Sequence, residues 1–119
     1  MGIESYKNLI VWEKSMDLVI LIYKLTEVFP KEEMYGIIMQ MRRCSVSIPS
    51  NIAEGSRRSS KKDFRNFLIN AYGSGAELET QIEISKRLKF GKIEYYLQVE
   101  NLLLEVMKML NKLINNLRV

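Results

Sequence analysis

The sequence predicts an all-α fold, an antiparallel up-down-up-down four-helix bundle formed by residues 1–119 as a single domain. Apolar residues recur every three or four positions in four successive segments, which is the pattern of helices with one buried face. No segment keeps a period-two alternation, and no Asn-Gly or Asp-Gly dipeptide marks a β-hairpin. The segments are separated by short polar or glycine-containing stretches, which favour antiparallel neighbours.

The first helix is expected over residues 9–29, because Pro30 disfavours helical geometry in the residue before it. The second is expected over residues 33–55, with Pro49 inside its apolar stripe. Proline removes a backbone donor and clashes with the preceding turn. Either the helix kinks at Pro49, which we favour because the stripe stays in phase, or a short new helix begins with Pro49 in its first turn.

The third helix is expected over residues 61–90 and the fourth over residues 93–117. Ser60 and Asp63 resemble a capping box at the start of the third helix. Gly91 suits a left-handed residue that closes it. Glycine inside a helix costs about 1 kcal/mol relative to alanine, so Gly73 and Gly75 indicate a close crossing of two helices.

The first helix carries more apolar surface than one core requires. A stripe of Trp12, Met16, Val19, Tyr23 and Thr26 is taken as the core face. A second stripe lies beside it and consists of Leu18, Ile22, Leu25 and Phe29. This second stripe either adds to the core of one chain or forms a subunit interface. We favour an interface within a ring-shaped homo-oligomer, because large exposed apolar patches are uncommon in monomers.

Positive charge is concentrated around the connection between the second and third helices. The basic residues of this window are Arg42, Arg43, Arg57, Arg58, Lys61, Lys62 and Arg65. With Glu54 and Asp63 the window carries +5, which exceeds the +4 of the whole chain. Such a cluster attracts phosphates and predicts salt-sensitive binding of RNA or DNA without a base code. The alternative is a solvated helix end that binds nothing.

Catalytic and metal chemistry is poorly supported. The chain has no histidine and one cysteine, which excludes histidine-dependent nucleophilic triads, histidine-containing metal sites and internal disulfides. Glu79 and Glu83 are one helical turn apart, but ion pairs along the helix explain them better than a magnesium site. We therefore expect no enzyme activity, no cofactor and no metal. No signal peptide or membrane-spanning run is visible, so the expected location is the cytoplasm.

One run of residues resembles a known family. The run is Ser47, Ile48, Pro49, Ser50, Asn51, Ile52, Ala53, Glu54 and Gly55, and further matches include Glu77, Glu79 and Gln81. It resembles the four-helix-bundle proteins encoded by intervening sequences of bacterial 23S ribosomal RNA genes, also called the S23 ribosomal protein family. We interpret the run as structural first and as part of a binding surface second, because a helix interrupted by proline must satisfy its freed backbone groups.

The resemblance implies an antiparallel bundle that assembles into a ring, typically a homopentamer, and offers no catalytic residues. The family is similar to the accessory protein of diversity-generating retroelements, which implies nucleic acid and a reverse transcriptase as possible partners. Two hypotheses follow. The first is an oligomeric bundle that binds RNA through the basic residues around the helix connection. The second is a protein–protein scaffold without nucleic-acid binding.

Overall fold

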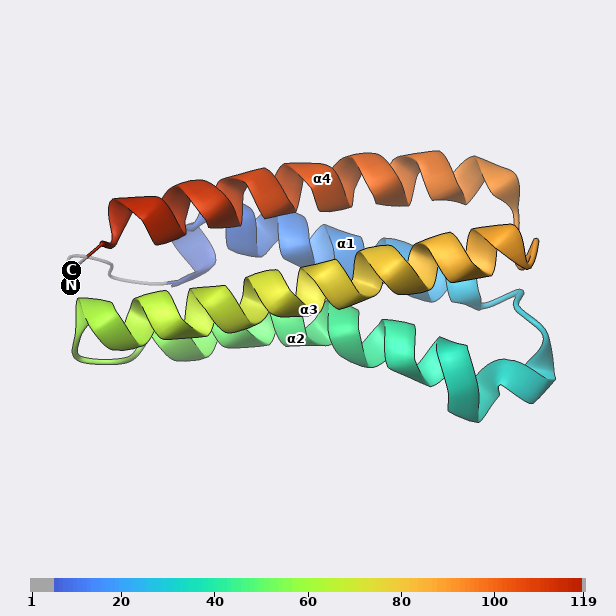
Figure 1. Cartoon of the computed structure of the whole chain (residues 1–119), viewed down its shortest axis with the longest axis horizontal. Coiled ribbons are helices and arrows are strands. Elements are labelled where there is room, and N and C mark those ends of the chain that lie inside the picture. Colours follow the sequence, from blue (N-terminus) through green and yellow to red (C-terminus); the bar gives the residue numbers. More distant parts are fainter. Residues whose placement is uncertain (1–5, 119) are drawn as a thin grey trace.

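The computed structural model describes residues 6–118 and contains four long helices, with no strand among those residues (Figure 1). They are α1 (Ile10–Thr26), α2 (Met39–Ser56), α3 (Lys61–Arg87) and α4 (Ile93–Asn116). A short 3-10 turn, η1 (Tyr6–Asn8), precedes α1. Residues 1–5 and 119 lie outside the described part, and so does most of the N-terminal segment from which the absence of a signal peptide was inferred.

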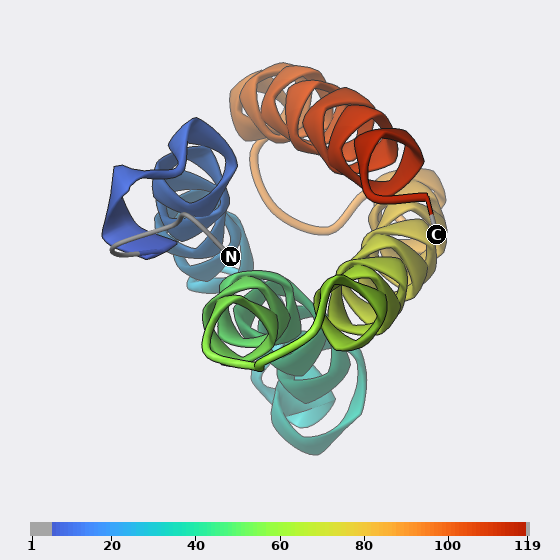
Figure 2. The ribbon, with the colours of Figure 1, turned by 90° about the vertical axis from the view of Figure 1, so that its left-hand side faces the viewer.

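The helices form the predicted antiparallel bundle, and each packs mainly against two neighbours. The packed pairs are α1 with α2, α2 with α3, α3 with α4, and α4 with α1. Viewed along its length, the molecule shows the four helices arranged around a common core (Figure 2). The bundle measures 44 × 24 × 21 Å, and α2 and α3 share the most extensive contact. In the described part, no helix is both long enough and apolar enough to cross a membrane.

The core face of α1 is centred on the second apolar stripe rather than on the one assigned from the sequence. Leu18, Ile22 and Leu25 are fully buried inside a single chain, and Phe29 is 4% exposed. These four residues are therefore unavailable for a subunit interface, and that part of the prediction is wrong. Of the stripe assigned to the core, Met16 and Tyr23 are exposed on the outer face, whereas Thr26 is buried.

Both stripes are apolar, so hydrophobicity alone could not decide between them. The buried face also contains two residues with hydroxyl groups, Ser15 and Thr26. Their hydroxyls donate to carbonyls of their own helix, at 2.8 Å to Trp12 and 2.8 Å to Ile22. Such back-bonding lets a hydroxyl enter an apolar core without an unsatisfied donor.

The second segment is irregular before α2, and Pro49 lies inside that helix. A 3-10 turn, η2 (Lys31–Glu33), leads into a π-helical turn, η3 (Met34–Ile38). Gly36 in η3 has non-helical backbone angles, φ −108° and ψ −116°. The helix α2 then continues through Pro49 without a break, so no new helix begins there. The non-helical backbone angles of this segment lie at Gly36, and the kink at Pro49 stays a prediction.

The ends of α3 follow from specific residues. Ser60 is the N-cap, and its hydroxyl accepts a hydrogen bond from the backbone N–H of Asp63 at 3.1 Å, as expected. At the other end Gly91 is left-handed as expected, with φ 74°, but the residue that closes the helix is Lys89, which is also left-handed, with φ 61°. The N–H of Phe90 donates to the carbonyl of Ser85 and the N–H of Lys89 to that of Lys86, which is a Schellman motif. The helix therefore ends at Arg87, three residues earlier than expected.

Small residues allow α2 and α3 to approach closely. A Cβ on Gly55 would lie 2.6 Å from the Cβ of Phe67 and 3.0 Å from the ring of Phe64. The hydroxyls of Ser47 and Ser74 are 2.8 Å apart across the same contact. Of the two glycines assigned to a crossing, Gly75 is buried against Met107 of α4, whereas Gly73 has open space around it.

Alanine at Gly55 and at Gly73 should have opposite effects on stability. Gly55→Ala forces a methyl group against the fixed Cβ of Phe67, and we expect a loss of roughly 1–3 kcal/mol. Gly73→Ala gains helix propensity at an exposed position with free space, and should stabilise the protein by about 1 kcal/mol. Urea unfolding followed by circular dichroism measures both. Equal stability of the two variants would contradict this packing of α2 on α3.

Candidate nucleic-acid interface

The connection between α2 and α3 lies at one end of the bundle (Figure 2). Basic residues are concentrated in this connection and in the first turns of α3. The group consists of Arg57, Arg58, Lys61, Lys62 and Arg65. The hydrogen bond from Asp63 to the Ser60 cap fixes where α3 begins. Lys61 and Lys62 therefore lie in its first turn, where they are exposed to solvent.

The three arginines of this group are held by contacts within the chain. The guanidinium of Arg57 lies over the ring of Tyr6, 5.4 Å from its centroid. Arg58 lies 4.8 Å from the centroid of the Phe67 ring and forms an ion pair of 2.8 Å with Glu54. Nε of Arg65 donates to the carbonyl of Ile114 at 3.1 Å, near the end of α4. No ion pair involves Lys61 or Lys62 among the described residues.

Arg42 and Arg43 do not belong to this end of the molecule. They lie near the start of α2, and fifteen residues separate Arg42 from Arg57. At 1.5 Å per residue this places them about 22 Å apart along the helix axis. The predicted set of seven basic residues is therefore divided between two regions, because closeness in sequence does not give closeness along a rigid helix.

Three further basic residues lie at the same end as Arg57 and were not predicted. They are Lys7 in η1, Lys112 in the last two turns of α4, and Arg118 just beyond α4. The contacts from Arg57 to Tyr6 and from Arg65 to Ile114 join these segments to the α2–α3 connection. The predicted antiparallel order already placed both chain ends beside this connection, so the topology could have identified them. We call these three residues, together with Arg57, Arg58, Lys61, Lys62 and Arg65, the basic end.

The run from Ser47 to Gly55 is built into the α2–α3 contact. Its apolar members Ile48, Pro49 and Ile52 are buried, and Ala53 is half-buried. Asn51 donates to the Ser47 carbonyl at 2.8 Å and to the Ser47 hydroxyl at 2.9 Å. Through the Ser47–Ser74 bond this links α2 to α3. Glu54 instead turns outward and pairs with Arg58.

Two of the polar matches on α3, Glu77 and Gln81, contact the single cysteine. The Cys44 thiol donates to Glu77 at 3.4 Å, and Gln81 donates to the Cys44 sulfur at 3.4 Å. Burial is the main cause that raises the pKa of the Cys44 thiol, and Glu77 raises it further. The thiol is therefore held protonated at neutral pH and is a poor nucleophile.

The acidic residues on α3 lie in ion pairs or on the surface in the described part of the chain. No group of three potential ligands among histidine, cysteine, aspartate and glutamate comes together there. Glu83 instead pairs with Arg87 at 2.9 Å, in the i, i+4 arrangement expected from the sequence. Lys86 reaches across to Glu100 of α4 at 3.3 Å. Glu79 is exposed.

Comparison with known proteins identifies the family of this chain. One solved structure is a protein of unknown function from the S23 ribosomal protein family of Bacteroides thetaiotaomicron VPI-5482. It is 28% identical, covers 89% of this chain and 96% of its own, and superposes with a TM-score of 0.81. No sequence among the curated proteins matches. The model of the 23S rRNA-intervening sequence protein family matches residues 7–112, and the chain therefore belongs to that family, as the Ser47–Gly55 run indicated.

Proposed function

We propose that this protein binds the sugar–phosphate backbone of a nucleic acid through its basic end, and that RNA is the favoured ligand. The observation that carries the proposal is the convergence of three segments on one end of the bundle. The start of the chain, the α2–α3 connection and the end of α4 all bring basic residues there. The acidic residues of the connection are Glu54, which already pairs with Arg58, and Asp63 at the start of α3.

Electrostatics favours phosphate as the ligand of this surface. Lysines and arginines that neutralise phosphates release condensed counterions, and this release drives binding. The N-terminal end of α3 adds the positive end of a helix dipole beside Lys61 and Lys62. The basic end presents charged side chains rather than a row of exposed aromatic rings, so binding would depend on backbone geometry rather than on base sequence.

Reversal of the two lysines in the first turn of α3 tests this proposal. We expect Lys61→Glu with Lys62→Glu to weaken binding of a fluorescein-labelled RNA duplex about tenfold or more. It should also lower the slope of log K against log salt by about 0.7–0.9 per lost contact. Acidic residues suit a helix N-terminus, so the double variant should keep or slightly raise its unfolding temperature. Fluorescence anisotropy between about 50 and 200 mM salt measures both quantities.

The matched control reverses the charge of two exposed lysines at the opposite end of the bundle. Lys31→Glu with Lys92→Glu changes the net charge by the same amount, in η2 and just before α4. This control should retain most of the affinity. If both double variants lose the same affinity for RNA, the effect depends only on net charge. If the affinity of the wild-type protein does not change with salt concentration, the interface does not bind phosphates.

Self-association is a second function that a separate observation favours. Ile93, Leu97 and Leu104 are 81%, 65% and 54% exposed along one stripe of α4. Their spacing of four and seven residues places them on one helix face. Such a stripe on the surface of a single chain indicates a partner. We propose that it contributes to contacts between copies in a closed ring, for which the family resemblance implies five subunits.

Polar residues on this stripe should shift the protein towards smaller species. We expect Leu97→Gln with Leu104→Gln to lower the molar mass measured by sedimentation at micromolar concentration, because the variant loses apolar contacts between copies. The fold should be retained, because exposed leucines add little to the core of one chain. Helical content by circular dichroism should stay unchanged. A wild-type protein that sediments as a monomer would rule out the ring. An intact ring with no nucleic acid after purification, shown by its absorbance at 260 and 280 nm, would favour the scaffold hypothesis.

A further inference from the structure

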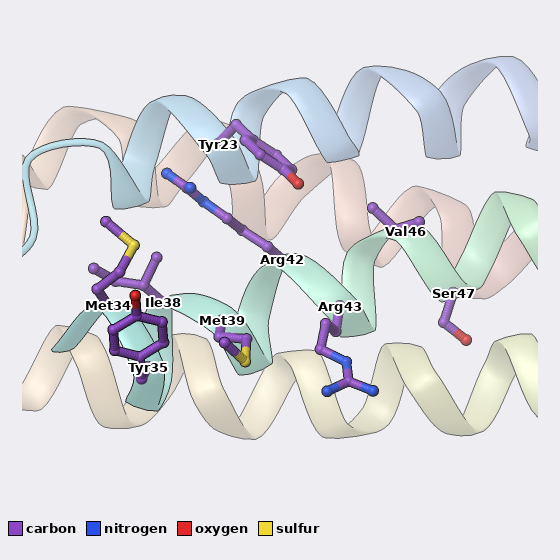
Figure 3. Close-up of a pocket in the computed structure, with 9 residues that line it drawn as sticks. All are labelled: Tyr23, Met34, Tyr35, Ile38, Met39, Arg42, Arg43, Val46 and Ser47. Carbon is purple, nitrogen blue, oxygen red and sulfur yellow. The ribbon is translucent and has the colours of Figure 1, made fainter.

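A groove lies at the other end of α2, between that helix and the last turns of α1 (Figure 3). It has a volume of about 560 Å³ and is lined mainly by Met34, Ile38, Met39 and Val46. Its lining contains two arginines, Arg42 and Arg43, and no acidic residue. Pockets of this size with apolar walls and few polar groups are typical of small-ligand sites.

Arg42 is fixed inside this groove by two contacts with α1. Its guanidinium lies 4.4 Å from the centroid of the Tyr23 ring, and its Nε donates to the Thr26 hydroxyl at 3.0 Å. Thr26 is itself held, because its hydroxyl donates to the Ile22 carbonyl. Figure 3 shows Arg42 extending towards Tyr23, whereas Arg43 points away from that ring.

The edge of Arg42 that carries Nη1 and Nη2 has no acceptor among the described residues. Arg42 is half-buried, and none of the ion pairs found among the described residues includes it. A guanidinium stays charged at any physiological pH. A charge removed from water costs free energy unless an opposite charge compensates it. The stacked face and the Nε atom are occupied, which leaves the two Nη donors in the geometry that binds a carboxylate with two hydrogen bonds.

The apolar walls indicate what such a carboxylate would be attached to. Met34, Met39 and Val46 are 44%, 37% and 40% exposed, so their side chains still have surface to bury. Methionine side chains adapt to ligands of irregular shape. Gly36, with its non-helical angles, lies in the π-helical turn that carries Met34 and Ile38 into the groove.

From this geometry we infer that the groove binds a small apolar carboxylate, such as a medium-chain fatty acid. The carboxylate pairs with Nη1 and Nη2 of Arg42, and the hydrocarbon lies along Met34, Met39 and Val46. The site is separate from the basic end, about 22 Å away along α2. Loss of RNA binding and loss of carboxylate binding can therefore be measured independently.

Titration with decanoate, with 1-decanol as the uncharged control, tests the inference. We expect decanoate to bind saturably with a Kd of roughly 0.1–1 mM. The methyl signals of Met34, Met39 and Val46 should shift in two-dimensional NMR spectra. Decanol should bind at least about tenfold more weakly, because it cannot form the charged pair with Arg42.

Two variants separate the role of Arg42 from a loss of folding. Arg42→Gln should weaken decanoate binding about tenfold while leaving decanol binding nearly unchanged. Met39→Glu places a negative charge at an exposed wall position and should also weaken decanoate binding, with helical content unchanged. Lys92→Gln, which removes one charge from the loop before α4, is the matched control and should bind as the wild type does.

Several results would overturn the inference. Equal affinities for decanoate and decanol would remove the role of the arginine, as would unchanged decanoate binding by Arg42→Gln. Methyl shifts confined to Leu97 and Leu104 of α4 would place the ligand elsewhere. Shifts of Met34 and Met39 that depend on protein concentration alone, without a response to decanoate, would show that a second copy occupies the groove. A response only to an acidic amphipathic peptide would reassign it to a protein partner.

Discussion

The close approach of α2 and α3 is the constraint on which the rest of this molecule depends. Gly55 admits Phe64 and Phe67 at a distance that a side chain on residue 55 would prevent. About two helical turns away, Ser47 joins Ser74, and Asn51 holds Ser47 in place. The contact orients the short connection between the helices. The positions of Arg58, which stacks on Phe67, and of the lysines in the first turn of α3 follow from it.

The antiparallel order determines which charges act together. The α2–α3 connection, the start of α1 and the end of α4 all meet at one end of the bundle, so residues distant in sequence form the basic end (Figure 1). Arg42 and Arg43 are nearer to Arg57 in sequence than Arg118 is, yet the rigid length of α2 separates them from it. A cationic region therefore lies at each end of α2, and the two regions have different surroundings. One is a solvated charged surface, and the other is an apolar groove with one fixed guanidinium.

The sequence predicted the fold well wherever a single residue type determines the local structure. The Ser60 cap and the four helices follow from capping chemistry and periodicity. The prediction failed where the sequence is compatible with two local arrangements. The stripes of α1 are both apolar, and only contacts with the other helices select Leu18 over Met16. The end of α3 was misplaced because Lys89 adopts a conformation that glycine prefers, in a Schellman motif completed by Phe90. The groove was not predictable, since it needs the irregular turn around Gly36 and the pairing of Arg42 with α1.

Within residues 6–118, stacking of arginine on an aromatic ring occurs three times, on Tyr23, Tyr6 and Phe67. A free arginine loses about 2 kcal/mol of rotamer entropy when a ligand immobilises it. Stacking uses the flat face of the guanidinium, whereas hydrogen bonds to anions use its edge. A stacked arginine has therefore lost part of its rotamer entropy before a ligand binds, and its N–H donors remain available. Arg58 differs from Arg42 and Arg57 because Glu54 already occupies its edge. Among the three, Arg42 and Arg57 are thus the arginines best prepared to receive an anion from outside the chain.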